Sequence, residues 1–256
     1  MLKKVIKFWD KNPCNVNHSK KKFLSKEYFL EVSKKKFKAE PHIKKFVKIK
    51  LKNKKILEIG CGIGTMGHFF CIKGANYCGL DISKKSLDIA KHRFKIFNLR
   101  GKLINGNCEL LTKYFKKNDK FDLIYSWGVL HHTPNIKKAI SQIYKISTKK
   151  TIIKIMLYSK NSYKQIMINN NLDQFEKAKG VPIANSFNRY EIKKLFAKFK
   201  IIKLEKDHIF PYIIKHYKKN RYIKQKWFRH MPNKIFKSLE KNLGWHTLIT
   251  LRKKIT

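Results

Sequence analysis

Acidic residues are scarce in this chain of 256 residues. Only 16 Asp and Glu stand against 61 Lys and Arg, which gives a formal net charge of +45 at pH 7. Such a field attracts RNA, DNA, anionic lipid surfaces and acidic metabolites. The basic residues are almost all Lys, however, and they extend from Lys3 to Lys254 without forming one cluster. Codons rich in A and T produce this composition without any partner, so a solvated Lys surface and a dedicated polyanionic partner both stay open.

The chain also lacks the residue spacings of a disulfide framework or a zinc site. Its five cysteines form no C-x-x-C pair and no Cys/His pattern with metal-ligand spacing. An odd number of cysteines without a framework is typical of reduced thiols. We therefore expect a cytoplasmic protein without a resident metal ion.

Long apolar runs are missing as well. No stretch approaches the roughly 20 apolar residues that are needed to cross a bilayer. The first ten residues carry charges but no apolar signal-peptide core. No repeat and no Pro- or Gly-rich linker divides the chain. Hydrophobic residues still make up 43% of it, which is enough for a buried core. These observations predict a soluble protein with no transmembrane segment.

What the chain does contain is an alternation of short apolar runs and helical stretches from residue 54 onward. Strand patterns begin at Lys55, Asn76, Lys102, Phe121 and Thr151. Strand–helix alternation predicts right-handed crossovers and a parallel sheet. We expect an α/β fold, with a Rossmann-like, seven-stranded, mostly parallel sheet and helices on both faces.

The two ends of the chain depart from this alternation. Residues 1–50 mix aromatic residues, Lys and two helical patterns, which predicts an N-terminal helical cap. The remaining residues, 51–256, are expected to form the main domain. Within it, strand patterns at 200–205 and 245–251 flank a basic, aromatic stretch. We predict that this stretch, about 211–243, is a helical insertion before the last strand and a partial lid on the sheet.

A glycine-rich turn follows the first predicted strand. Gly60, Gly62 and Gly64 let the backbone turn tightly and approach a ligand directly before a helix N-terminus. The second strand ends about 20 residues further on in Asp81, whose two carboxylate oxygens suit the two hydroxyls of a ribose. The pattern predicts a nucleotide-type ligand at this turn.

Two ligands compete for this turn. Residues 62–67 satisfy G-x-G-x-x-G, so a nicotinamide dinucleotide is one of them. Glu58 favours the other, because dinucleotide-binding strands are normally apolar up to the first glycine. An acid at this position can attract the ammonium group of a methionine moiety. The alternative interpretation of Glu58 is a strand residue that faces solvent.

Four motifs, in the correct order, resemble those of class I S-adenosylmethionine (SAM)-dependent methyltransferases. The motifs are Glu58-x-Gly60-x-Gly62-x-Gly64, Leu80-Asp81-Ile-Ser, Gly106-Asn-Cys-Glu-Leu-Leu111 and Phe121-Asp-Leu-Ile-Tyr-Ser-Trp-Gly-Val-Leu-His-His-Thr-Pro134. They are most similar to the small-molecule branch that includes quinone and sterol methylases. Segments 9–14, 156–162, 180–184 and 244–246 also resemble a bacterial subgroup. The resemblance implies a Rossmann-like fold with SAM as the cofactor.

The resemblance assigns the cofactor site to residues at or just beyond the ends of the first four strands. These residues are Glu58, Gly60, Cys61, Gly62, Gly64, Asp81, Ile82, Asn107, Cys108, Glu109, Ser126 and Trp127. It implies that the glycines wrap the methionine part, that Asp81 holds the ribose and that Ile82 packs on the adenine. Residues 107–109 would lie at the adenine edge. Asn107 stands where an Asp is common, and its amide oxygen can still accept a hydrogen bond, so we expect weaker binding.

Two adjacent histidines follow the fourth predicted strand. Methyl transfer is an in-line displacement at a sulfonium methyl, and its leaving group is neutral. Catalysis therefore rests on positioning and water exclusion, with a base only if the nucleophile carries a proton. His131 and His132 are candidates for that base. The alternative is that they only shape the wall of the cleft and cap the next helix.

Three functions remain compatible with the sequence. The leading one is a SAM-dependent methyltransferase that acts on a small-molecule or lipid-like acceptor at an O, C, N or S atom, and this acceptor can be anionic. The second is an RNA methyltransferase that uses the basic surface. It is not favoured, because the fourth strand lacks an Asn/Asp-Pro-Pro-Tyr/Phe motif and no separate RNA-binding module is present. The third is a non-catalytic protein that binds SAM or a dinucleotide, since a Rossmann-like fold does not determine activity.

Overall fold

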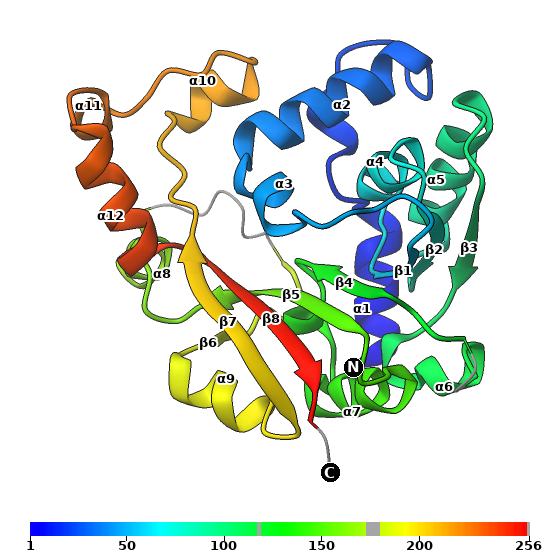
Figure 1. Cartoon of the computed structure of the whole chain (residues 1–256). Helices are drawn as coiled ribbons and strands as arrows, with labels where there is room; N and C mark the ends of the chain where they lie inside the picture. Colours follow the sequence, from blue (N-terminus) through cyan, green and yellow to red (C-terminus); the bar gives the residue numbers. More distant parts are fainter. Residues whose placement is uncertain (117–118, 173–179, 255–256) are drawn as a thin grey trace.

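The computed structural model describes residues 1–116, 119–172 and 180–254, and one mixed sheet forms its centre. The strand order is β3-β2-β1-β4-β5-β8-β7 (Figure 1). Strands β1 to β5 run parallel, and β8 lies antiparallel between β5 and β7. The predicted Rossmann-like, mostly parallel sheet is confirmed. The strand order reverses between β1 and β4, which is where ligands bind in open α/β sheets.

The parallel half alternates strands and helices as the sequence predicts. Its elements are β1 (Lys55–Ile59), α4 (Thr65–Ile72), β2 (Asn76–Asp81), α5 (Lys84–Ile96), β3 (Gly101–Asn105), η2 (Cys108–Leu110), α6 (Leu111–Tyr114), β4 (Leu123–Trp127), η3 (Leu130–His132), α7 (Ile136–Ile146) and β5 (Ile152–Ser159). Side-chain caps fix several helix starts. Ser83, for example, accepts a hydrogen bond from the backbone of Ser86 at the start of α5.

The C-terminal part completes the sheet and carries the insertion. Its elements are α8 (Tyr163–Asn169), β6 (Ser186–Phe187), α9 (Arg189–Leu195), β7 (Phe199–Asp207), α10 (Ile214–Lys218), α11 (Lys226–Arg229), α12 (Asn233–Leu243) and β8 (His246–Lys253). The helical insertion before the last strand is confirmed, as three short helices. Among the described residues, no helix combines the length and the apolar character that a membrane span requires.

The predicted number of seven strands was wrong, because the sheet has eight. The additional strand, β6, has only two residues, and it pairs parallel with Tyr158 and Ser159 at the end of β5. There it continues the edge along which β4 has already ended at Trp127, opposite Met156. Two residues are too few to give an alternating hydrophobic pattern, so this strand has no signal in the sequence.

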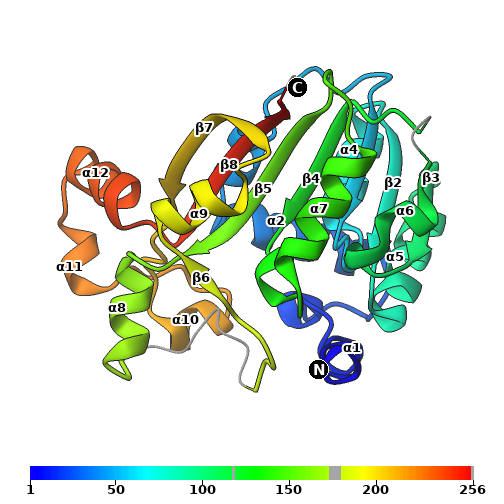
Figure 2. The same cartoon turned by 90° about the horizontal axis from the view of Figure 1, so that it is seen from below.

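Helices cover both faces of the sheet, as predicted. On one face, α7 and α9 pack on strand residues such as Leu57 and Ile155 (Figure 2). On the other face, α3 (His42–Phe46), α4 and α5 pack on Ile56 and Tyr125. Neighbouring strand residues therefore point to opposite faces, and both faces are buried.

The N-terminal residues form the predicted helical cap. Its elements are α1 (Leu2–Lys11), η1 (Val16–His18), α2 (Lys26–Ala39) and α3. Ile43 and Phe46 of α3 belong to the same buried cluster as β1 and α4. The cap therefore shares its core with the sheet, and the boundary at residue 50 stays a prediction.

Candidate active site

A cavity of about 760 Å³ opens at the carboxyl ends of the parallel strands. Its lining includes Gly60 after β1, Asp81 at the end of β2 and Trp127 at the end of β4. Trp9 of α1 and Tyr217 of α10 line it from the cap and from the insertion. Figure 2 shows α1 and α10, apart from each other, on the lower side of the sheet. The volume is in the range of small-molecule sites, so the fold offers a site for a small molecule at the strand-order reversal.

The glycine-rich turn forms one wall of this cavity. Gly60 has φ +77°, and a Cβ there would lie 2.1 Å from Cγ2 of Val129, so only glycine fits. Gly62 has φ +52°, and a Cβ there would meet nothing within 4 Å. The bare backbone at Gly62 therefore leaves room for a ligand to approach closely. Cys61 also lines the cavity, whereas Gly64 starts α4 and does not.

Asp81 is held by two backbone amides. Its Oδ2 accepts a hydrogen bond from the Gly62 N–H at 2.7 Å, and its Oδ1 accepts one from Ser83 at 2.9 Å. Burial raises the pKa of Asp81, and these two amides oppose that shift. Each carboxylate oxygen keeps accepting capacity for another donor. The geometry therefore orients the carboxylate at the cavity wall, where a ribose would need it.

Glu58 is buried in the strand, so the solvent-facing alternative was wrong. It is 3% exposed and accepts a hydrogen bond from the Tyr77 hydroxyl at 2.5 Å. Burial raises the pKa of Glu58 to about 8, because the charged form is poorly solvated there. Nearby, Thr65 Oγ1 is buried without a hydrogen-bond partner among the described residues. Both residues line the cavity and can take up the polar groups of a ligand.

Not all residues assigned to the adenine end line the cavity. Ile82, Asn107 and Cys108 do. The Asn107 side chain also accepts a hydrogen bond from the Glu109 N–H at 2.9 Å, which caps the short helix η2. Glu109 lies outside the cavity lining and accepts a hydrogen bond from the Asn135 N–H at 2.8 Å. Glu109 therefore holds the start of α7 in place.

Ser126 and Trp127, the two residues predicted for the site at the end of β4, lie in different surroundings. Ser126 belongs to the core, and Trp127 belongs to the cavity lining. Ser126 is fully buried, and its hydroxyl donates to the Ile59 carbonyl at 3.2 Å. Trp127 lines the cavity, and its indole Nε1 donates to Glu40 at 2.9 Å. Glu40 also lies 3.6 Å from the Lys36 ammonium group. The cap thus fixes the orientation of Trp127, and the cavity lining adds Lys36 and Glu40 to the predicted residues.

The two adjacent histidines occupy different environments. His131 has no exposed surface, is not part of the cavity lining and packs on Tyr158 with ring centroids 3.8 Å apart. His132 lines the cavity, and its Nδ1 lies 2.5 Å from the Ile183 carbonyl. A carbonyl only accepts, so Nδ1 carries the proton and Nε2 keeps a lone pair. Burial lowers the pKa of His132, so its imidazole is neutral at pH 7. Only His132 is placed to act on a ligand.

Aromatic rings line the cavity around His132 and His246, and this part is its aromatic end. Trp9 lies against His132 with ring centroids 5.2 Å apart, and Tyr158 stacks on Trp245 at 4.3 Å. The Trp245 indole Nε1 is buried without a hydrogen-bond partner among the described residues. Tyr158 is the last residue but one of the parallel strand β5, so its place followed from the strand pattern. Trp245 comes just before an antiparallel strand, and only the fold brings it to this edge.

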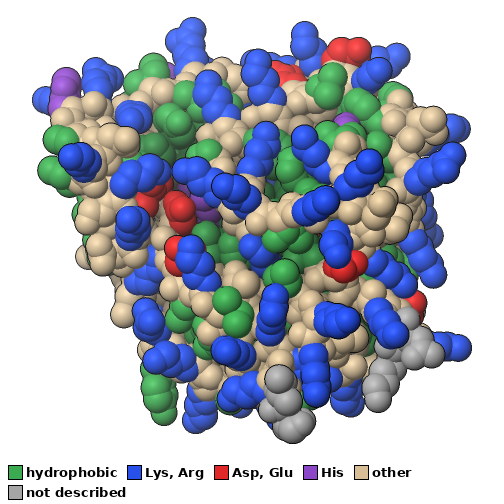
Figure 3. All heavy atoms as spheres, viewed as in Figure 1, with side chains coloured by type: hydrophobic (Ala, Val, Ile, Leu, Met, Phe, Trp, Pro, Cys, Tyr) green, Lys and Arg blue, Asp and Glu red, His purple; other side chains and the backbone are tan. Residues whose placement is uncertain are grey.

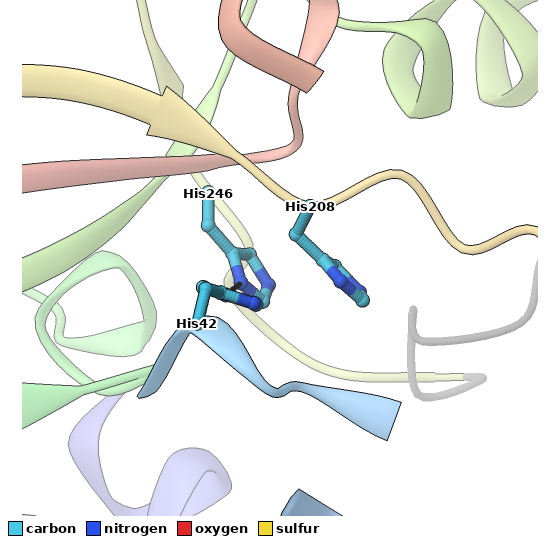
Figure 4. Close-up of side chains that lie close together, drawn as sticks. All are labelled: His42, His208 and His246. Atoms are coloured by element: carbon cyan, nitrogen blue, oxygen red, sulfur yellow. Dashed lines mark hydrogen bonds between the residues drawn. The ribbon is translucent and has the colours of Figure 1, made fainter. Parts of the chain in front are cut away.

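Three buried histidines lie close together beside the aromatic end. The sequence contains no motif with metal-ligand spacing, so it showed no sign of this cluster. His42, His208 and His246 offer ring nitrogens that all lie within 4.8 Å of one another (Figure 4). His42 Nε2 lies 2.9 Å from His246 Nδ1. Burial lowers the pKa of both His42 and His246. Their separation along the chain explains why no spacing motif revealed them.

The family of methyltransferase domains matches residues 33–200. The chain belongs to this family. The match runs from α2 to β7 and contains the glycine-rich turn, Asp81 and the end of β4. The predicted relationship to class I methyltransferases is confirmed, and the family supports SAM as the cofactor of this methyltransferase domain.

Similar proteins include enzymes for different acceptors. A ubiquinone biosynthesis O-methyltransferase of Pelagibacter ubique is 34% identical over 110 residues, which is 43% of this chain and 44% of that enzyme. A putative ribosomal RNA large subunit methyltransferase of Methanocaldococcus jannaschii is 30% identical over 87 residues, 32% of this chain and 22% of that protein. The chain therefore matches less than half the length of either relative.

Solved structures extend the similarity to the whole methyltransferase fold. The magnesium protoporphyrin IX methyltransferase from Synechocystis PCC 6803 with bound SAM has a TM-score of 0.60. It is 12% identical, and the alignment covers 99% of this chain and 97% of that one. At this identity the similarity concerns the fold.

Proposed function

We propose that this chain transfers a methyl group from SAM to a small-molecule or lipid-like acceptor. The observation that carries the proposal is one cavity with two chemically different ends. Glu58 and Asp81 supply carboxyl groups at one end, on β1 and β2, and Tyr158 and Trp245 supply aromatic walls at the other, by β5 and β8. Trp127 lies between them, at the strand-order reversal.

The residues of the polar end fit the cofactor. Glu58 and the unpartnered Thr65 hydroxyl would bind the amino acid part, and the bare backbone of Gly62 would let it approach. Asp81 would accept hydrogen bonds from the ribose, while Ile82 and Cys108 would pack near the adenine. Bound there, SAM supplies an electrophilic methyl group on a sulfonium sulfur.

The protein contributes orientation, exclusion of water and a base. Trp127 is fixed by Glu40 and can hold the acceptor in line with the methyl group. Trp9 and Tyr217 cover the cavity and keep water out. The neutral imidazole of His132 can remove a proton from an acceptor hydroxyl, because its Nε2 keeps a lone pair. An acceptor with an oxygen nucleophile therefore fits this site.

The surroundings of the cavity favour an acceptor that is small or has an apolar tail. The Trp245 indole can donate to a polar group of the acceptor head. Ile214 lines both the cavity and a neighbouring open groove of about 470 Å³. Met167, Leu172 and Trp227 contribute apolar surface to that groove. An apolar tail can therefore leave the cavity past Ile214 and lie in the groove.

RNA is the second candidate acceptor, and the net charge favours it. Figure 3 shows Lys and Arg over the whole visible face, with few acidic side chains between them. This distribution is expected of a generally basic surface, while a dedicated RNA path would concentrate basic residues in one stripe. The covers over the cavity also leave less room for a polynucleotide than for a small molecule.

The test is incubation of the purified protein with methyl-labelled SAM and fractionated cell extract. Label is counted separately in small metabolites, lipids, RNA and protein, and the same extract without the protein serves as the blank. We expect label in the metabolite or lipid fraction. Label confined to RNA would replace this proposal with the second candidate. Failure to bind SAM at all would contradict both.

A further inference from the structure

Three histidines that are far apart in the sequence meet under the aromatic end of the cavity. His42 is the first residue of α3, His208 follows the end of β7, and His246 is the first residue of β8. Their exposed fractions are 4%, 2% and 5%. Figure 4 shows the His42 and His246 rings meeting, with the His208 ring beside them. The ring centroid of His208 lies 4.5 Å from that of His246 and 5.0 Å from that of His42.

The cluster is polar although it is buried. Each imidazole brings two polar nitrogens into the interior, where each needs a partner. His42 and His246 each use one nitrogen in the hydrogen bond between them, which is 2.9 Å long. Imidazole nitrogen is also the commonest protein ligand for transition metals.

Hydrogen bonds and close packing hold the backbone of His208 in place. His208 has φ +75°, a left-handed conformation that is costly for a residue with a side chain. Its carbonyl accepts a hydrogen bond from the Trp245 N–H at 2.8 Å, and its N–H donates to Asp207 Oδ1 at 2.7 Å. A Cβ on Gly244 would lie 2.4 Å from the Asp207 carbonyl oxygen. Close packing of these segments therefore fixes His208 beside His246.

We propose that His42, His208 and His246 bind one divalent transition-metal ion, with Zn²⁺ as the best-suited example. Tetrahedral Zn²⁺ binds imidazole at about 2.0–2.1 Å, which separates neighbouring ligand nitrogens by about 3.3 Å. The nitrogens here already lie within 4.8 Å of one another. Side-chain rotation brings them to the ion, and coordination replaces the hydrogen bond between His42 and His246.

The fourth coordination position would face the cavity. His246 is part of the cavity lining, whereas His42 and His208 are not, so the ion is open on the His246 side. Trp127 packs against both His42 and His246, with ring centroids 5.3 and 5.4 Å apart. Three protein ligands with one open position is the arrangement of catalytic zinc sites. Resting on the proposed function, this position would hold an oxygen of the methyl acceptor.

Cobalt titration tests the site without SAM or acceptor. Co²⁺ alone is added to the metal-free full-length protein, and its visible absorption band is followed because Co²⁺ is coloured where Zn²⁺ is not. We expect one equivalent to bind, with a band whose intensity indicates tetrahedral coordination, and Zn²⁺ to displace it. Absence of a band, or binding only at many equivalents, would overturn the proposal.

Matched variants locate the ion. His208→Phe and His42→Phe keep an aromatic ring and remove the ligand atom, and we expect each to weaken Co²⁺ binding at least about 100-fold. His68→Phe, at a half-buried histidine outside the cluster, is the control and should bind like the wild type. Circular dichroism shows which variants are folded, and either cluster variant suffices. Undiminished binding in a folded cluster variant would overturn the assignment. Metal binding without methyl transfer would instead contradict only the proposed function.

Discussion

Glu58 is the residue whose burial has the clearest consequence. Its carboxyl group lies in the sheet, next to the Tyr77 hydroxyl, and its pKa is raised to about 8. The folded protein therefore holds a proton on Glu58 that the unfolded chain releases near pH 4.5. An ammonium group bound beside it would favour the charged form, so ligand binding at pH 7 would release that proton.

The first prediction is a pH-dependent effect of Glu58→Gln on stability. Below about pH 4.5 the glutamic acid is neutral in both states, so its ionisation costs nothing. As the pH rises towards 8, the wild type loses stability that the Gln variant keeps, on the order of a few kcal/mol. Thermal unfolding between pH 4 and 9 should show that the Tm of the variant rises relative to the Tm of the wild type as the pH increases. A constant difference across this range would contradict the raised pKa.

The second prediction concerns Asp81→Asn. Loss of the charge weakens the hydrogen bonds from the ribose, so we expect the Kd for SAM to rise about 10- to 100-fold. The amide oxygen can retain one of the hydrogen bonds from Gly62 and Ser83, and the other N–H then faces the amide NH2, so the free energy of unfolding should fall by about 1–3 kcal/mol. Calorimetric titration measures the Kd. Asp88→Asn on the exposed side of α5 is the control, and an unchanged Kd in Asp81→Asn would remove the ribose assignment.

The third prediction separates the two adjacent histidines. His132→Ala should lower kcat about 100-fold with an unchanged Kd for SAM, because a general base contributes at least this much. His131→Ala should mainly lower Tm, since its ring fills fully buried space against Tyr158. Single-turnover kinetics and thermal unfolding distinguish these effects. Equal turnover in the two variants would mean that positioning alone drives the reaction.

At the scale of elements, the sequence predicts well whatever depends on local pattern. The strand–helix alternation, the turn at Gly60 and the end of β2 at Asp81 were all visible in it. The pattern of residues 189–199 is helical throughout, but α9 ends at Leu195, because β7 already begins at Phe199 and pairs with Lys253. Long-range pairing decided that boundary, and local propensity could not show it.

Contacts between distant segments account for the rest of what the sequence missed. Ser126 and Glu109 were placed in the site by their motifs, but their hydrogen bonds tie them to Ile59 and Asn135. The His42, His208 and His246 cluster has no sequence signal, because its members come from the cap, from the residue after β7 and from β8. A spacing motif can reveal only ligands that share a local segment.

The fourth prediction tests α1 as a cover over the cavity. Asp10 near its end accepts hydrogen bonds from the Ser83 hydroxyl at 2.8 Å and from the Lys85 N–H at 3.2 Å, at the start of α5. Asp10→Ala removes this anchor, and a lost cap interaction of this kind is worth about 1 kcal/mol. We expect faster proteolysis of residues 1–24 and an approximately fivefold higher Kd for SAM. Asp88→Ala is the control, and unchanged proteolysis would mean that α1 is held by its other contacts.

The whole molecule carries its charge with little internal compensation. Among the described residues, ion pairs such as Lys54–Asp122 and Lys160–Glu191 lie on the surface and are partly exposed. Exposed ion pairs of this kind contribute little to the free energy of unfolding. A net charge of +45 therefore leaves self-repulsion that the fold must withstand.

The fifth prediction follows from that repulsion. Raising NaCl from about 20 mM to about 300 mM shortens the screening length from roughly 20 Å to below 10 Å, so Tm should rise by several degrees. Differential scanning fluorimetry at constant pH measures it, with the same series in KCl as the control. A Tm that is independent of salt would show that the Lys side chains are too well separated to destabilise the fold.

The extent of the family match along the chain bears on how substrate preference can diverge between homologues. The family match covers residues 33–200, but Trp9, Tyr217, Trp245 and His246 lie outside it and form much of the acceptor end. On the proposed function, part of the acceptor choice is therefore encoded outside the stretch that the family shares, and part of it, through Trp127, His132 and Tyr158, inside that stretch. Exchange of the two terminal stretches between homologues would then shift substrate preference without replacing the glycine-rich turn or Asp81.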